Sequence, residues 1–184
     1  MKGGLFLSFL CYNLTGGVKM EEILNYLNNY FYSYALMTNV TFEEDGKSFT
    51  ISKFKKNFYK GQYIKIEETT INDGIFKIIS IRDNGDSITI TTDATEFAEG
   101  NFRCFILSLA VPRPVIKLKE AIEEFKAKNK PSVYTSESFG NYSRSWATNS
   151  KGAILTWKDV FKEDLNQYRC MFDDREGMEV ITWL

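Results

Sequence analysis

Histidine is absent from this sequence of 184 residues. Its absence removes the usual general base, the Ser-His and Cys-His nucleophile pairs and the commonest metal ligand at once. The three cysteines, Cys11, Cys104 and Cys170, are far apart and odd in number, which matches neither a zinc pattern nor a disulfide framework. No Walker-type loop and no G-x-G-x-x-G motif is present. The sequence therefore predicts a protein that is not an enzyme and that uses no metal and no cofactor.

An excess of positive charge is also missing, because 23 lysines and arginines stand against 24 acids and give a net charge of -1. This balance lacks the basic surface that binding to a phosphate backbone requires. Aromatic residues, in contrast, make up 15% of the chain, and a surplus of rings over what one core needs is typical of protein interfaces. We therefore expect protein partners and no sequence-specific binding of DNA.

Residues 1–19 contain an apolar run from Leu5 to Leu10 that is too short to span a bilayer. It follows a lysine, as in a signal peptide, but no clear small-x-small cleavage site comes after it. The segment GGVKM offers another explanation, since its codons would place a ribosome-binding sequence just before Met20. We expect Met20 to be the authentic start, residues 1–19 to be a leader or a mis-assigned start, and the protein to have no membrane partner.

The apolar periodicity predicts an α+β fold. In residues 20–37 and 108–172 apolar side chains recur every three or four positions, as on one face of a helix, and Thr156 with Asp159 forms an approximate capping pair. In residues 38–107 the period changes to two. Three turn-forming dipeptides interrupt that region: Asp45-Gly46, Asp73-Gly74 and Asn84-Gly85. We expect a small helical core of about three amphipathic helices with an inserted β-rich subdomain, either a small sheet or a barrel.

The segment 131–155, called the arm below, is long for a connection between two predicted helices. Its sequence YTSESFGNYSRS has too many rings for a solvated loop and too many hydroxyls for a core strand. We expect an extended arm or a strand pair that adds to a neighbouring subunit, and the alternative is a hairpin packed on its own subunit's sheet. The predicted subunit-interface residues are Tyr134, Ser136, Glu137, Ser138, Phe139, Gly140, Tyr142 and Arg144.

The C-terminal tail, residues 173–184, is acidic at first and then apolar. A soluble monomer has little reason to display such an apolar end, so we expect this tail to contact a partner. The predicted contact residues are Val180, Ile181, Trp183 and Leu184.

Five segments, taken in order, resemble a family of small head-tail connector (adaptor) proteins of tailed bacteriophages and prophages of Gram-positive bacteria. They are ILNYLNNYF, FKKNFYKGQYIKIEETTINDGIFKI, AVPRPVIKLKEAIEEF, YTSESFGNYSRS and TWKDVFKEDLNQYR. The most specific pieces are F-x-x-GQY-x-x-I, NDGIF and S-E-S-F-G-N-Y-S, and none of them is a catalytic signature. The resemblance covers most of the chain after Met20, while the long β region and the extended tail depart from shorter members.

The resemblance implies a structural virion protein. Such proteins form a homo-oligomeric ring, typically a dodecamer, below the portal of the filled capsid, where they extend the DNA channel and dock the next neck or tail component. The arm would then join neighbouring subunits, and the C-terminal tail of the chain, residues 173–184, would contact the portal or the neck. The implied location is the portal vertex of the virion, with assembly in the host cytoplasm.

DNA would pass through the channel without sequence-specific binding, because an acidic or mixed lining does not hold phosphates. Glu120, Glu123 and Glu124 lie on the polar face of the middle predicted helix and are candidates to face that channel, with a solvated outer face as the alternative. A head-closure or tail-terminator protein is the second interpretation of the whole chain. A host binding module or enzyme is the third.

Overall fold

The computed structural model describes residues 18–54, 58–128, 136–139, 142–145, 155–170 and 179–182. The predicted leader therefore lies outside the described residues, apart from Val18 and Lys19. The helices are α1 (Met20–Leu27), α2 (Arg113–Lys128), α3 (Trp157–Val160) and α4 (Lys162–Asn166). The strands are β1 (Tyr32–Phe42), β2 (Ser48–Ser52), β3 (Tyr63–Glu67), β4 (Gly74–Asp83), β5 (Ser87–Thr92), β6 (Gly100–Leu109), β7 (Ser136–Phe139), β8 (Tyr142–Ser145) and β9 (Glu179–Thr182).

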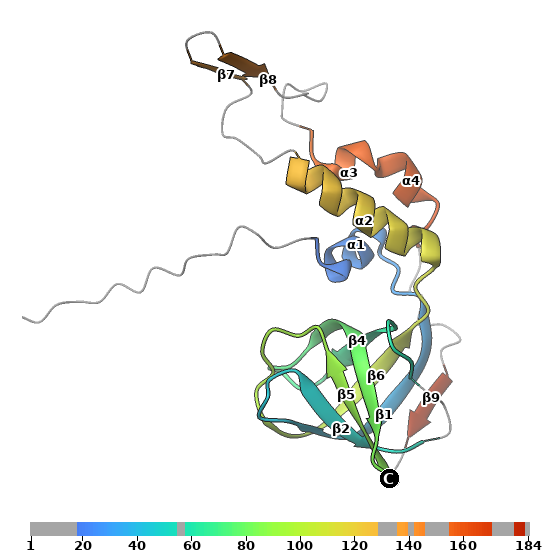
Figure 1. Ribbon diagram of the computed structural model, residues 1–184. Coiled ribbons are helices and arrows are strands. Elements are labelled where there is room, and N and C mark those ends of the chain that lie inside the picture. Colours follow the sequence, from blue (N-terminus) through green and yellow to red (C-terminus); the bar gives the residue numbers. More distant parts are fainter. Residues whose placement is uncertain are drawn as a thin grey trace, which may run out of the picture.

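The first six strands close into an antiparallel barrel, the lower part of the molecule in Figure 1. Their order is β2-β5-β4-β3-β6-β1, and β1 pairs back with β2 to complete the ring. The long strand β1 pairs with β6 from Tyr32 to Phe42 on one side, and with β2 from Val40 to Phe42 on the other. Closure pairs the backbone groups that the outer strands of an open sheet would leave exposed.

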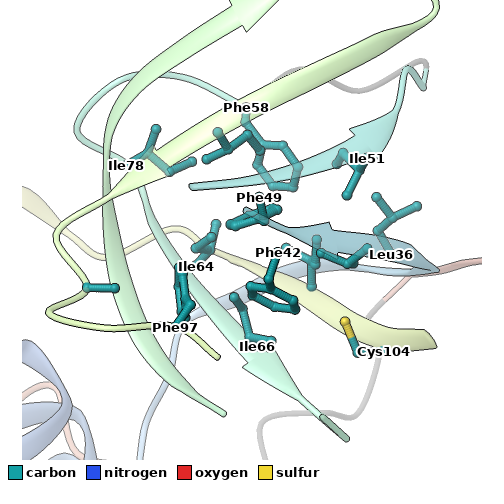
Figure 2. Packing of buried hydrophobic residues seen from close by; sticks show 14 of the residues in the cluster. Leu36, Phe42, Phe49, Ile51, Phe58, Ile64, Ile66, Ile78, Phe97 and Cys104 are labelled. Atoms are coloured by element: carbon teal, nitrogen blue, oxygen red, sulfur yellow. The ribbon is translucent and has the colours of Figure 1, made fainter. Parts of the chain in front are cut away.

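Aromatic and β-branched side chains fill the inside of the barrel (Figure 2). Along β1 the burial alternates, since Val40 and Phe42 are buried while Asn39 and Thr41 are exposed. The ring of Phe42 lies 4.9 Å from that of Phe97 and 5.7 Å from that of Phe49, between centroids. Edge-to-face and tilted contacts of this kind stabilise a core beyond the area they bury.

The four helices pack around a second apolar cluster on the outside of the barrel. Its helical members include Leu24 of α1, Ile122 of α2 and Trp157 of α3. Tyr63 of β3 and Leu109 of β6, which are register partners in the sheet, join the same cluster. The helical layer is thus fixed to the barrel where β3 and β6 meet, and in Figure 1 it lies above the barrel.

The predicted helical core with a β-rich insertion is wrong, because the closed barrel is the main body and the helices are few and short. The first predicted helix stops at Leu27, where Asn28 takes a left-handed φ of 49°, and β1 begins at Tyr32. The segment 32–42 also carries Tyr, Phe, Val and Thr at alternating buried positions, which favours a strand. The apolar residues from Tyr30 to Leu36 therefore matched helical spacing only by coincidence, whereas those of α1 are helical.

The second predicted helical segment, 108–172, begins too early, because its first residues continue the apolar run of β6, which extends to Leu109. A short apolar run fits a buried strand and a buried helix equally well, and only its pairing partners, β1 and β3, decide between them. The third predicted helix is divided into α3 and α4 at Phe161, whose backbone leaves the helical region with φ of -99° and ψ of 12°.

Several local predictions are confirmed. Gly46 and Gly85 have φ of 66° and 91° in the turns between β1 and β2 and between β4 and β5. Residues that carry a Cβ rarely adopt this backbone conformation. Residues Arg113–Lys128 form α2. The carboxylate of Asp159 accepts hydrogen bonds from the backbone N–H and the hydroxyl of Thr156, at 2.9 and 2.6 Å, and so caps α3.

The loop between β3 and β4 folds around the carboxylate of Asp73. Glu68 and Thr70 both have φ of 73°, which is rare for residues other than glycine, and the N–H and hydroxyl of Thr69 donate to Asp73 Oδ1 at 2.8 and 2.5 Å. Burial alone would raise the pKa of Asp73, but the hydrogen bonds from Thr69 and from the backbone of Glu68 and Thr70 outweigh it and lower the pKa below its usual value. The ionised carboxylate therefore stabilises this loop.

Two consecutive isoleucines of β4 test the barrel core. Ile78 is 0% exposed and Ile79 is 43% exposed. We expect Ile78→Ala to lower the free energy of unfolding by about 2–5 kcal/mol, because it leaves a cavity in the barrel. The matched variant Ile79→Ala should change it by no more than about 0.5 kcal/mol. Urea unfolding followed by tryptophan fluorescence measures both, and equal effects would contradict the assignment of the barrel interior.

The pKa of Asp73 predicts a pH-dependent difference between the protein and its Asp73→Asn variant. Because folding lowers this pKa, the stabilisation is present above the pKa of the unfolded chain, about 3.9, and is lost as the pH falls through the lower folded value. We expect the variant to be less stable at pH 7 and the difference to shrink towards pH 2.5. Urea unfolding at the two pH values measures it, and a difference independent of pH would show that the charge plays no part.

Candidate interaction surfaces

The arm contains a β-hairpin of β7 and β8, which form a two-stranded sheet of their own. Neither strand is hydrogen-bonded to any other strand in the described part of the chain. In Figure 1 the hairpin lies beyond α2 and α3, at the far end of the molecule from the barrel. Of the two forms expected for the arm, the strand pair is the one that the structure contains.

The hairpin register brings most of the predicted interface residues together. It places Ser138 opposite Ser143 and Phe139 opposite Tyr142. It also places Glu137 opposite Arg144, and opposite charges at such positions favour pairing. Tyr134 and Gly140 lie outside the described residues.

The predicted tail residues fall on a second surface, the outer edge of β1. Val180 and Ile181 are part of β9, which runs parallel to β1. The register pairs Val180 with Ala35 and Ile181 with Leu36. Trp183 and Leu184 lie outside the described residues.

The sequence did not identify the β1 edge from Tyr34 to Met37 as a binding surface. Residues 20–37 were expected to be helical, and a helix offers no strand edge. The alternation of buried residues in β1 is the signal that was available. The partner of this edge could not be found from the sequence, because β9 lies more than a hundred residues away along the chain.

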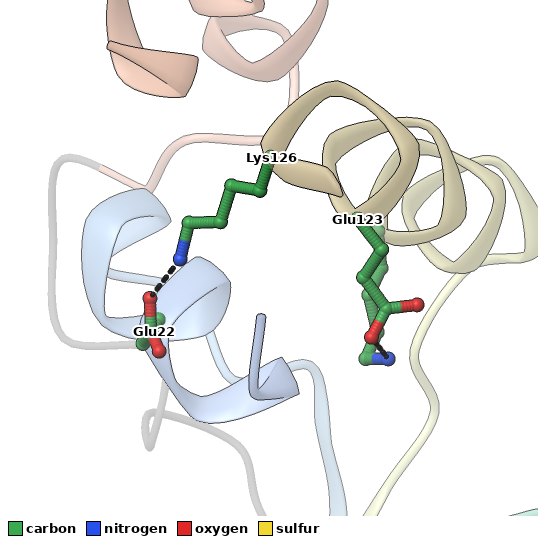
Figure 3. A network of polar contacts seen from close by, with 4 residues as sticks. Glu22, Glu123 and Lys126 are labelled. Carbon is green, nitrogen blue, oxygen red and sulfur yellow. Dashed lines mark hydrogen bonds and ion pairs between the residues drawn. The ribbon is translucent and has the colours of Figure 1, made fainter. Parts of the chain in front are cut away.

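The three predicted acids of α2 have different surroundings. Glu123 pairs with Lys119 at 2.6 Å and is partly buried, while Glu124 is exposed and lies 3.6 Å from Lys128. Glu120 is exposed. Figure 3 shows that Glu123 is not part of the ion pair between α1 and α2, which joins Glu22 to Lys126 at 3.3 Å. The acids therefore do not form one uniform face.

Glu123 also lines a cleft of about 360 Å³ between the barrel and the helical layer. Charged lining residues of both signs include Lys19, Asp73, Asp93 and Lys119. Burial, together with the negative charges of Asp93, Glu123 and Glu120, raises the pKa of Tyr63 in this cleft to about 12. The phenol of Tyr63 therefore stays protonated at neutral pH and cannot act there as a base.

The other groups that could carry chemistry are few among the described residues. Burial, with the negative charges of Asp73 and Glu68, raises the pKa of the Cys104 thiol to about 12, so Cys104 remains an unreactive thiol in the barrel core. Cysteines, aspartates and glutamates in the described ranges nowhere gather in a group of three that could hold a metal ion. None of the helices in these ranges has both the length and the apolar composition needed to cross a bilayer.

Comparison of the chain with protein-family models, with curated proteins and with solved structures gives no match.

Proposed function

We propose that this chain is a structural protein of a tailed bacteriophage, a head-tail connector that forms a ring below the portal. The ring extends the DNA channel and docks the next component of the neck or tail. The proposal rests on two observations. The first is that five segments of the sequence, described above, resemble the head-tail connector family, and the second is structural. That observation is the hairpin β7–β8, which contains S-E-S-F-G-N-Y-S, one of the three most specific pieces of the resemblance.

The hairpin supports a role in assembly because it is too small to be stable by itself. Two strands of four residues each are at best marginal in water unless another surface covers them. In the described part of the chain no third strand extends this sheet. A neighbouring subunit supplies such a surface in a ring, where the outer edges of β7 and β8 are available for strand addition.

The charges of the described surface are compatible with a channel for DNA. Exposed lysines and acids are interspersed, as in the pairs Lys53–Asp83 and Lys128–Glu124. A lining of this kind does not concentrate positive charge, so phosphates are not retained as the DNA moves through. Glu120 and Glu124, the two exposed acids of α2, remain the candidates for the channel wall.

Localisation of the chain in a native particle tests the function directly. Electron cryo-microscopy of the neck should place a ring of this chain between the portal and the next neck component. A ring at the far end of the tail tube, or a chain absent from the particle, would overturn the proposal. A position directly at the gate that closes the DNA channel would instead support the head-closure interpretation.

Variants of the arm test its role in joining subunits. We expect the double variant Phe139→Ala and Tyr142→Ala, and separately the deletion of 136–145, to leave the melting temperature of the isolated protein nearly unchanged. Both should abolish the joining of tails to filled heads, because the hairpin loses both of these rings. In vitro joining of purified heads and tails, scored by infectivity and by electron microscopy, measures the effect.

Tyr59→Ala is the matched control, since Tyr59 is an aromatic residue of the barrel region that is 60% exposed. Its removal deletes an exposed ring without touching the arm, so joining should proceed at the normal rate. Normal joining with the arm variants would refute the assignment of the hairpin as a subunit interface. A loss of joining with Tyr59→Ala as well would mean that the assay responds to any lost surface ring.

A further inference from the structure

One side of β1 is only partly covered by strands of the barrel. On one side β1 is paired with β6 along its whole length, but on the other side β2 pairs only with Val40 to Phe42. At the preceding residues Tyr34 to Met37 the strand that pairs with β1 on that side is β9 instead of a strand of the barrel. The four residues Tyr34–Met37 are called the acceptor edge below. It is a site for strand addition that a segment from outside the barrel fills.

The surface beside the acceptor edge is apolar and covered. Because side chains alternate along a strand and Leu36 and Ile106 point into the barrel core, their neighbours Ala35 and Leu107 face outward. Ala35 and Leu107 are nevertheless only 1% and 2% exposed. Strand addition by β9 therefore takes place beside buried apolar surface as well as along the strand edge.

The strand that fills the acceptor edge, β9, is held to β1 by a short stretch of strand pairing. The pairing of β9 with β1 is parallel, whereas all the strand pairs of the barrel are antiparallel, and it involves four residues. Parallel pairing is slightly less stable per residue than antiparallel pairing. A short strand of this kind can exchange with an identical one without losing hydrogen bonds.

The chain before β9 is anchored near the start of β1. The N–H of Cys170 donates to the carbonyl of Leu27 at the end of α1, at 3.1 Å, and the side chain of Asn28 donates to the carbonyl of Cys170 at 3.4 Å. Eight residues then separate Cys170 from Glu179, and the nine steps between these two Cα atoms span at most about 30 Å. This reach covers the acceptor edge of the same chain, and also the acceptor edge of any neighbour that lies within the same distance of Cys170.

We propose that the acceptor edge binds β9 of a second copy of this chain, so that neighbouring subunits are linked by exchanged C-terminal strands. This proposal deepens the proposed function, because it names the segment that connects neighbouring subunits of the ring. It rests on the proposed function only because it requires a neighbouring copy of the chain. The exchanged strand forms the same four register pairs between chains that β9 forms within one chain. Each copy donates one strand and accepts one. In a ring this exchange makes a head-to-tail interface, whereas two copies that exchange strands reciprocally form a two-fold dimer.

Disulfide trapping between two different variants tests the exchange. Adjacent strands lie about 4.7–4.9 Å apart, which is within the Cα separation that a disulfide bridges. Met37 is the register partner of Thr182 and faces outward, so one chain carries Met37→Cys and a tagged, longer chain carries Thr182→Cys. Cys11 and Cys170 are replaced by serine in both chains, while the buried Cys104 is kept. The two chains are co-expressed and oxidised with glutathione.

We expect a disulfide-linked heterodimer of the two variants on non-reducing gels, confirmed by mass spectrometry of the linked peptides. The matched control replaces Met37→Cys with Thr41→Cys. Thr41 is on the same outward face of β1 but four residues further, about 13 Å from the partner position. The control pair should give no heterodimer.

A third variant, with Met37→Cys and Thr182→Cys in one chain, completes the test. The exchange is overturned if this variant closes an internal disulfide while the mixed chains give no heterodimer at concentrations where the protein is oligomeric. It is also overturned if neither arrangement gives a disulfide, because the register itself is then absent. The mixed chains could also give a heterodimer while light scattering finds no species larger than a dimer. That result would support the exchange of β9 and contradict the ring.

Discussion

The antiparallel pairing of β1 with β6 is the constraint on which the rest of this structure depends. These two strands share a ladder from Tyr32 to Phe42, and its inward residues supply Leu36, Phe42 and Ile106 to the barrel core. The end of the same ladder holds Leu109, which anchors the helical layer. Since β1 is longer than its other neighbour β2 can cover, this one strand also sets where the barrel has an open edge.

Closure of the barrel determines how this protein can associate with other copies. A closed barrel has almost no free strand edges, so it neither aggregates readily nor forms rings by pairing barrel strands with those of a neighbour. Any association through strand pairing would then use segments that leave the barrel. Among the described residues these are the hairpin β7–β8 and the strand β9, which lie before and after the short helices α3 and α4 in the sequence. The barrel and the helical layer form the body of the protein, and the two segments are the parts that could extend to a neighbouring copy.

The sequence predicted the local features of the fold better than its organisation. The turns at Gly46 and Gly85 and the helix α2 follow from short-range rules, because the residues that decide them are neighbours in the chain. The fold class was wrong because segments 32–37 and 108–109, at the two borders of the predicted β region, match helix and strand equally well until their partners are known. The arm could be found from composition alone. The acceptor edge could not, since it is defined by which strands pair with β1.

The exchange of β9 would give the ring a direction as well as a connection. Donor and acceptor are different parts of one chain, so each contact is heterologous, and such contacts close into a ring only if the rotation between neighbours is fixed. A flexible tether alone would also permit open filaments. The anchor of Cys170 on Leu27 and Asn28 ties the donor to the end of α1, and α1 belongs to the helical layer packed on the barrel. On this proposal the angle between neighbours would depend on how the hairpin β7–β8 of one subunit meets the next. The two segments would then have separate tasks, since β9 would link the subunits and the hairpin would set their rotation.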